Sequence, residues 1–123
     1  MKFTGIVKKH LGRGKKLGFP TANIEAPKEI EDGLFLAFTE IASKKYPSIL
    51  FVGASQTFDE TDRRAESYVL DFSGDLYGQE IEIEIVKKLR DNKKFDSQKA
   101  LIEQMKKDEK VAKEFFKDYN LDN

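Results

Sequence analysis

The eight residues Gln79–Val86 (QEIEIEIV) alternate strictly between isoleucine and glutamate, and this alternation constrains the fold more than any other stretch. In an extended chain Ile81, Ile83 and Ile85 fall on one face and the three glutamates on the other. A strand with one apolar and one hydrated face is typical of an antiparallel sheet, because parallel strands are usually buried on both faces. The segment therefore predicts an antiparallel β-sheet that packs one face on a core.

Five other short segments have the length and apolar content of strands, and no helical pattern separates them. Turn signals such as Asp32-Gly33 and Ser73-Gly74-Asp75 divide them. Closing such a set removes the unpaired edges that a short open sheet exposes, so we expect an all-β, six-stranded antiparallel closed β-barrel. The expected strands are Lys2–Lys8, Thr21–Ile24, Leu34–Ile41, Pro47–Val52, Ser67–Phe72 and Gln79–Val86.

From Ser97 onward the hydrophobic period changes from two to that of a helix. Asp96 is a candidate N-cap, because its carboxylate can accept a bond from an orphan amide. We expect a C-terminal helix over residues 97–119, with one interruption near 108–110 allowed by the pattern, in a single domain of residues 1–123 with its barrel at about 2–90. The residues of the apolar stripe are Leu101, Ile102, Met105, Ala112, Phe115, Phe116 and Tyr119.

The distribution of charge is more informative than its total, which is zero. Residues 1–24 contain six Lys or Arg and no acid, whereas residues 25–86 contain five bases and fourteen acids. This pattern indicates a local anion site at the N-terminal end of the chain. The absence of cysteine and the presence of only one histidine, His10, argue against thiolate zinc sites, cysteine nucleophiles and a Ser-His-Asp arrangement.

The stretch Gly12–Asn23 (GRGKKLGFPTAN) combines three glycines, three cations and a Pro-Thr-Ala-Asn corner. It matches neither the P-loop nor the dinucleotide fingerprint. If the corner is extended, Thr21 and Asn23 point to the same face and present two neutral oxygen donors, which suit a Mg²⁺ ion carried on nucleotide phosphates. The alternative is a polar turn in which both side chains satisfy backbone groups.

Four motifs, in order from about Thr4 to Phe116, resemble the signature of bacterial and eukaryotic riboflavin kinases. They are GRGKKLGFPTANI, GLFLAF, VGASQTF and the long stretch AESYVLDFSGDLYGQEIEIEIVKKLRDNKKFDS. The resemblance implies a six-stranded barrel with a C-terminal helix. It also implies transfer of the γ-phosphoryl group of ATP to the 5′-hydroxyl of riboflavin, which gives FMN and ADP.

The resemblance also implies a role for particular residues. Glu66 would be the catalytic carboxylate, and Thr21 and Asn23 would hold Mg²⁺, or Mn²⁺ or Zn²⁺, together with the phosphates. These roles require Thr21, Asn23 and Glu66 to meet at the rim of the barrel. A flap of about residues 90–96 would cover the flavin. The remaining implied contacts are Gly12, Gly14, Lys16 and Tyr77 with the nucleotide, and Arg90, Lys93 and Phe95 with the flavin.

The chain departs from the family pattern at His10-Leu11, at Gln56 and at Tyr68, where the family has Gly-Asp, Pro and His. The alternatives are a non-catalytic flavin- or nucleotide-binding barrel and, less favoured, a nucleic-acid-binding barrel using the basic loop. The expected protein is a cytoplasmic monomer that binds no nucleic acid and no membrane. It starts only a few residues before the barrel, so we expect no adenylyltransferase module.

Overall fold

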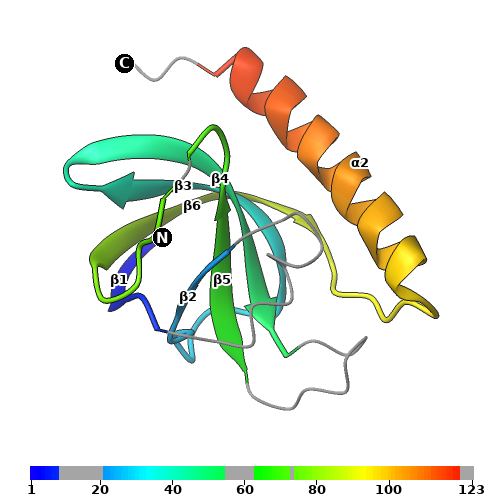
Figure 1. The fold of residues 1–123 in the computed structure, drawn as a ribbon, viewed down its shortest axis with the longest axis horizontal. Coiled ribbons are helices and arrows are strands. Elements are labelled where there is room, and N and C mark those ends of the chain that lie inside the picture. The colour runs from blue at the N-terminus through cyan, green and yellow to red at the C-terminus, as the bar shows by residue number, and fades with distance from the viewer. Residues whose placement is uncertain (9–20, 55–62, 73, 120–123) are drawn as a thin grey trace.

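The computed structural model describes residues 1–8, 21–54, 63–72 and 74–119 of the 123-residue chain. Within them six strands form one sheet and one long helix follows (Figure 1). The elements are β1 (Lys2–Ile6), β2 (Ala22–Ile24), β3 (Gly33–Ile41), β4 (Lys44–Gly53), β5 (Arg64–Val69), β6 (Glu80–Arg90) and α2 (Gln98–Lys117).

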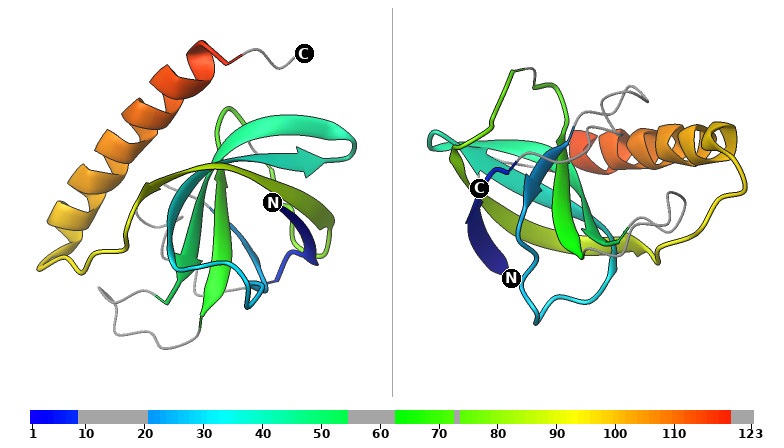
Figure 2. Two further views of the ribbon diagram at one scale, coloured as in Figure 1. Left: turned by 180° about the vertical axis from the view of Figure 1, so that it is seen from behind. Right: turned by 60° about the horizontal axis from the view of Figure 1, so that its bottom comes forward.

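All five strand pairings are antiparallel, and the order across the sheet is β1-β6-β3-β4-β5-β2. The sheet curls until its two edge strands, β1 and β2, approach each other (Figure 2). Just beyond the end of β1, an isolated bridge joins the two edges among the described residues, and in it the Lys8 N–H donates to the Asn23 carbonyl at 2.7 Å. A Cβ at Gly5 would lie 3.0 Å from Cβ of Ile24, so the two edges are close there as well.

The barrel is therefore nearly closed, and the expectation of a fully closed barrel was wrong in that respect. The physical reason is length. The β1 ladder ends at Ile6 and β2 has only three residues, so the two edges are too short to form a continuous ladder.

The alternation predicted for β6 is confirmed, because Ile81 and Ile83 are buried in the barrel interior while Glu80 is exposed. The interior also contains a polar group of three buried hydroxyls. Thr39 Oγ1 lies 2.9 Å from Ser48 Oγ and 2.7 Å from Ser67 Oγ, so these side chains satisfy one another away from water. The apolar interior is formed mainly by Val7, Ile24, Phe35, Leu50, Val52, Ala65, Val69, Ile81 and Ile83.

Helix α2 is continuous and covers part of the outer face of the barrel (Figures 1 and 2). Its N-cap is Ser97, whose Oγ accepts a bond from the Ala100 N–H at 3.1 Å, and not Asp96 as expected. The helix is not interrupted near Asp108, where the sequence pattern had allowed a break. The Asp108 side chain turns inward and binds Arg90 on β6. The apolar layer beneath the helix consists of Leu34, Leu36, Ile49, Leu70 and Ala112, with Phe51, Tyr68, Leu89, Phe115 and Phe116 packed against it.

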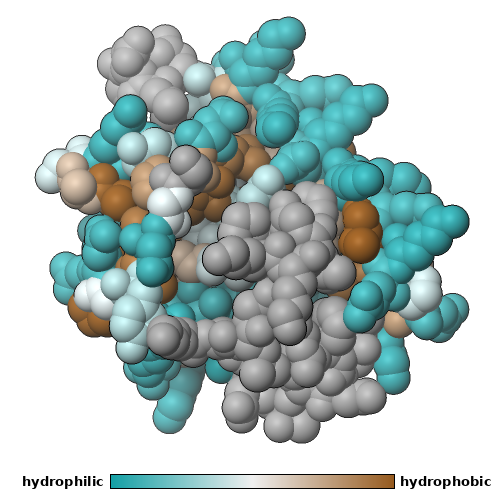
Figure 3. Space-filling model, in the orientation of Figure 1, coloured by the Kyte–Doolittle hydropathy of each residue, from teal (hydrophilic) through white to brown (hydrophobic). Residues whose placement is uncertain are grey.

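The outward surface of α2 is hydrophilic in Figure 3, as expected of a helix that buries one face.

Along β4 and β5, successive side chains contribute alternately to the barrel interior and to the apolar layer beneath α2. Ala65, Leu50 and Val52 point into the barrel, whereas Phe51 and Tyr68 point outward toward the helix. Among the residues that the structure describes, no helix is both long and apolar enough to cross a membrane.

Candidate functional site

Five residues on five different strands form one row across the outer face of the sheet. Asn23 pairs with Glu66, Glu66 with Phe51, Phe51 with Leu34, and Leu34 with Arg90. We call this set the cross-strand row. Antiparallel pairing therefore places one predicted metal ligand (Asn23), the predicted catalytic residue (Glu66) and one predicted flavin residue (Arg90) in one line, although Asn23 and Arg90 are far apart in the sequence.

Glu66 points to the outer face because its neighbours Ala65 and Ser67 fill the interior. Both of its carboxylate oxygens have partners. Thr21 Oγ1 donates to Oε1 at 2.8 Å, and Nη2 of Arg64 lies 2.8 Å from Oε2. The Glu66 side chain is 15% exposed and that of Arg64 is 11% exposed, so the carboxylate is held in place yet still reachable from solvent.

The expectation that Thr21, Asn23 and Glu66 come together is met, although they lie on the outer face of the strands. The Thr21 hydroxyl uses its single hydrogen on Glu66, which leaves its oxygen lone pairs for another group. The Asn23 Oδ1 is buried and has no hydrogen-bond partner among the described residues. A buried carbonyl oxygen without a donor is a natural ligand for a hard cation, so this pair fits a Mg²⁺ ion.

The described residues contain no group of three or more His, Cys, Asp or Glu side chains placed to hold a metal ion. The candidate cation ligands are therefore the two neutral oxygens of Thr21 and Asn23. A Mg²⁺ ion that takes only one or two protein ligands keeps its other positions for water and phosphate oxygens.

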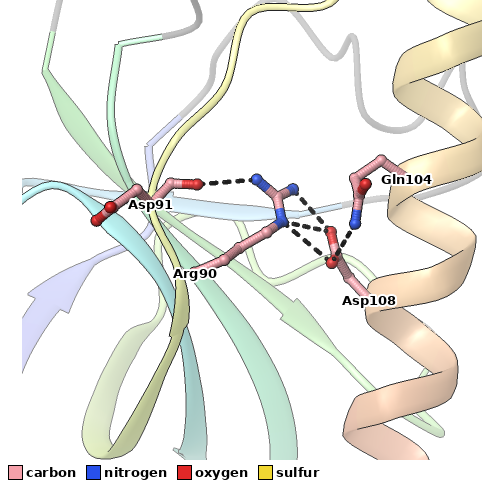
Figure 4. Close-up of polar contacts among 4 residues, drawn as sticks. All are labelled: Arg90, Asp91, Gln104 and Asp108. Carbon is pink, nitrogen blue, oxygen red and sulfur yellow. Dashed lines mark hydrogen bonds and ion pairs between the residues drawn. The ribbon is translucent and has the colours of Figure 1, made fainter.

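At the far end of the cross-strand row, Arg90 binds the helix (Figure 4). Its Nη2 donates to Oδ2 of Asp108 at 2.7 Å, and its Nε lies within 3.2 Å of both carboxylate oxygens. Gln104 Nε2 donates to the same carboxylate at 3.0 Å, and Arg90 Nη1 donates to the Asp91 carbonyl at 3.1 Å. This guanidinium thus joins the end of β6 to α2, and its predicted contact with flavin stays a prediction.

Tyr68 lies two residues beyond Glu66 on the same face of β5 and is one of the residues that depart from the family pattern. Its hydroxyl donates to Oε2 of Glu109 on α2. Burial raises the pKa of Tyr68 to about 12, and the adjacent Glu109 carboxylate adds to the rise. The tyrosine therefore ties the helix to the strand that carries Glu66.

The predicted flap follows β6 as an irregular connection to α2. Lys88 pairs with Glu31 at 3.1 Å and with Asp91 at 2.5 Å. These contacts raise the pKa of Lys88 and lower that of Asp91. Asn92 Nδ2 donates to the Val52 carbonyl at 2.9 Å, which fixes the start of the connection to β4.

Two of the predicted flavin residues lie in this connection. Lys93 Nζ is 5.6 Å from the centre of the Phe95 ring, a cation–π arrangement. Tyr77 lies in the turn before β6, half exposed, with its N–H bonded to Asp75 Oδ1 at 2.9 Å. Gly12, Gly14 and Lys16, the predicted phosphate loop, lie outside the described residues.

Sequence reasoning did not assign a role to Arg64 or Asp108. Both are charged residues that are almost fully buried. The strand expected at Ser67–Phe72 begins three residues earlier in the structure, at Arg64, and only this earlier start gives Arg64 and Glu66 the same strand parity and the same face. No signal in the sequence pointed to Asp108 either, since its partner lies 18 residues away on another element.

Comparison with known proteins supplies the family. The model of the flavokinase family, described as riboflavin kinase, matches residues 1–116. A trifunctional protein, RibF/MnmA, of Mycoplasmoides gallisepticum is 36% identical over 91% of this chain and 18% of its own length. An RNA-binding riboflavin kinase of Bacillus subtilis is 34% identical over 90% of this chain and 50% of its own length.

The riboflavin kinase of Trypanosoma brucei has the same fold, with a TM-score of 0.65 and 22% identity over 98% of this chain and 82% of that one. The chain spans at most half the length of the RibF/MnmA protein and of the Bacillus subtilis kinase. One of them carries RNA binding in its name, so the expectation that this chain binds no nucleic acid stays a prediction. The match over residues 1–116, together with the shared fold, establishes that the chain belongs to the riboflavin kinase family.

Proposed function

We propose that this protein transfers the γ-phosphoryl group of ATP to the 5′-hydroxyl of riboflavin, giving FMN and ADP. One observation carries the proposal. Glu66 lies beside Thr21 and opposite Asn23, so that a held carboxylate and two candidate cation ligands occupy one small area of the outer face. Membership of the riboflavin kinase family supports the choice of substrates.

In this reaction the bond between the γ-phosphorus and its bridging oxygen breaks, and a bond to the ribityl oxygen forms. Glu66 would orient the 5′-hydroxyl and accept its proton as that bond forms. A carboxylate within hydrogen-bond reach of the proton contributes about 10²–10⁴-fold to such a step. Most of the remaining catalysis in phosphoryl transfer comes from positioning and from charge stabilisation.

Thr21 and Asn23 would hold the divalent ion that accompanies ATP. Mg²⁺ is our choice, because the two donors are neutral hard oxygens, and Mn²⁺ or Zn²⁺ are the alternatives. When bound, the ion neutralises charge on the phosphates. The orphaned Asn23 Oδ1 supports this assignment independently of any resemblance, because a buried acceptor without a donor is otherwise costly.

The nucleotide phosphates would also contact Gly12, Gly14 and Lys16, with Tyr77 near the nucleotide, as the resemblance implies. The flavin would lie under the connection after β6, where Lys93 and Phe95 already form a cationic and aromatic pair. Arg90 would contact the flavin through the N–H groups of Nη1 and Nη2 that its bonds to Asp108 and to the Asp91 carbonyl do not use. We propose a cytoplasmic monomer.

The direct test incubates the protein with riboflavin, ATP and Mg²⁺, and follows FMN and ADP by chromatography, with parallel reactions in Mn²⁺ and Zn²⁺. We expect FMN and ADP to form in equal amounts, and neither to form when the divalent ion is removed. Riboflavin binding without any product in all three metals would contradict the proposal and identify a non-catalytic flavin carrier.

A further inference from the structure

We infer that Arg64 is a positioning residue for the proposed reaction, because it fixes the orientation of the Glu66 carboxylate. The inference rests on the proposed function of Glu66. Arg64 is the residue at the start of β5, two positions before Glu66, so the two side chains share the outer face of the strand. Their contact, from Nη2 to Oε2 at 2.8 Å, has the length of a charge-assisted hydrogen bond.

Arg64 is itself well held. The residue is only 9% exposed, and the centre of its guanidinium lies 5.9 Å from the centroid of the Phe51 ring. Phe51 in turn belongs to the apolar layer beneath α2. The packed Phe51 ring beside the guanidinium restricts the positions that it can take, so it can act as a support for the carboxylate.

The two oxygens of the Glu66 carboxylate have different partners. Oε2 is bound by Arg64, while Oε1 accepts only the neutral hydroxyl hydrogen of Thr21 among the described contacts. Rotation of the carboxylate would break both contacts at once. Oε1 therefore keeps a fixed position and a spare lone pair for the substrate hydroxyl. Because loss of about 1 Å in placement can cost roughly 10²-fold in rate, this support is expected to act on turnover.

The preceding residue provides a matched control. Arg63 points to a different part of the molecule, where its Nε donates to Oδ1 of Asp32 at 2.7 Å and its Nη1 donates to the Pro27 carbonyl at 3.0 Å. Its Nη2 bonds the Ile30 carbonyl. Arg63 therefore fastens the segment before β3, whereas Arg64 holds Glu66. The two neighbouring arginines have the same side-chain chemistry, but Arg64 contacts Glu66 whereas Arg63 contacts the segment before β3.

The experiment compares Arg64→Met, Arg64→Lys and Arg63→Met in the FMN-forming assay, with circular dichroism to confirm folding. For Arg64→Met we expect kcat to fall about 10²-fold, with KM for riboflavin and for ATP changed less than about threefold. Arg64→Lys keeps the charge but lacks the planar guanidinium donor, so a fall of about tenfold in kcat is expected. Arg63→Met should keep the kcat of the unmodified protein.

A double variant shows whether Arg64 acts through Glu66. If it does, adding Arg64→Met to Glu66→Gln lowers kcat by less than about twofold beyond Glu66→Gln alone, because the carboxylate to be positioned is already gone. A full additional 10²-fold loss would overturn the inference and make Arg64 a direct substrate contact. Wild-type kcat in Arg64→Lys, or a loss confined to KM, would overturn it too. If the unmodified protein forms no FMN, the proposed function itself fails, and this inference fails with it.

Discussion

Two arginine–carboxylate pairs lie near opposite ends of the cross-strand row, and they are built differently. Arg64 and Glu66 are two residues apart on one strand, and one guanidinium nitrogen reaches one carboxylate oxygen. Arg90 and Asp108 lie on β6 and α2, and the guanidinium engages both oxygens of an aspartate whose side chain is 7% exposed (Figure 4).

The difference lies in what each carboxylate can still accept. Asp108 already receives three hydrogen bonds from Arg90 and one from Gln104, so its oxygens are largely occupied by contacts that attach the helix. Glu66 receives one contact at each oxygen and remains twice as exposed. The saturated Asp108 pair therefore attaches the helix, whereas the incomplete Glu66 pair leaves acceptor capacity for the chemistry proposed above.

Neutralising each carboxylate in turn is the most direct test of the difference between Glu66 and Asp108. For Glu66→Gln we expect turnover to fall by about 10²–10⁴-fold, because an amide cannot accept the proton of the substrate hydroxyl. Nucleotide binding, measured by calorimetry, should remain largely intact. The free energy of unfolding should fall as well, by about 3 kcal/mol, because the neutral amide leaves the 11% exposed Arg64 side chain without its counter-ion. A variant with the wild-type rate would show that Glu66 is not the base.

Neutralising the other carboxylate should damage the fold and not the chemistry. For Asp108→Asn we expect the free energy of unfolding to fall by about 3 kcal/mol, the lower end for a broken buried pair, because the 24% exposed Arg90 side chain can be partly rehydrated. Urea unfolding measures this loss. The matched control is Glu103→Gln, an exposed position on the same helix. An equal loss in both variants would mean that the Arg90 contact does not hold α2.

The smallest expected effect concerns Tyr68, which links the two regions. Tyr68→Phe should cost about 1 kcal/mol of unfolding free energy at neutral pH, the value of one hydrogen bond. Since the folded-state pKa is raised to about 12, the contribution is complete below about pH 10, the pKa of an unperturbed tyrosine, and declines as pH rises toward 12.

The measurement is the difference in stability between the unmodified protein and Tyr68→Phe as a function of pH. Subtracting the two curves removes the background from lysine titration, and Tyr119→Phe, at a half-exposed tyrosine, provides the control. A difference that stays constant between pH 9 and 12 would mean that the Tyr68 hydroxyl is not involved in the linkage.

Much of the architecture was readable from local patterns. The Ile-Glu alternation of β6 and the apolar stripe of α2 each depend on one segment, so periodicity was enough to predict them. The N-cap was misassigned because Asp96 and Ser97 are adjacent and both favour that position, and only the Ala100 contact distinguishes them. Barrel closure depends on the lengths of β1 and β2, which propensity does not determine.

The candidate site was readable only in part. Thr21, Asn23 and Glu66 were identified by motif, and their meeting is visible in the Thr21–Glu66 hydrogen bond and the Asn23–Glu66 pairing. The supporting contact from Arg64 was missed because the expected strand began at Ser67, whereas β5 begins at Arg64. The commitment of Arg90 to Asp108 was missed too, because it depends on how α2 returns across the sheet.

The cross-strand row has a consequence for how this chain tolerates insertions and deletions. Each strand contributes one residue to the row, and successive residues of a strand face opposite sides. Adding or removing a single amino acid within β5 would slip its pairing and turn Glu66 into the apolar interior. The same change in the connection between β6 and α2, which follows Arg90, would leave every member of the row in register. We therefore expect length variation in this family to be confined to the connections, with the strands that cross the row constant in length.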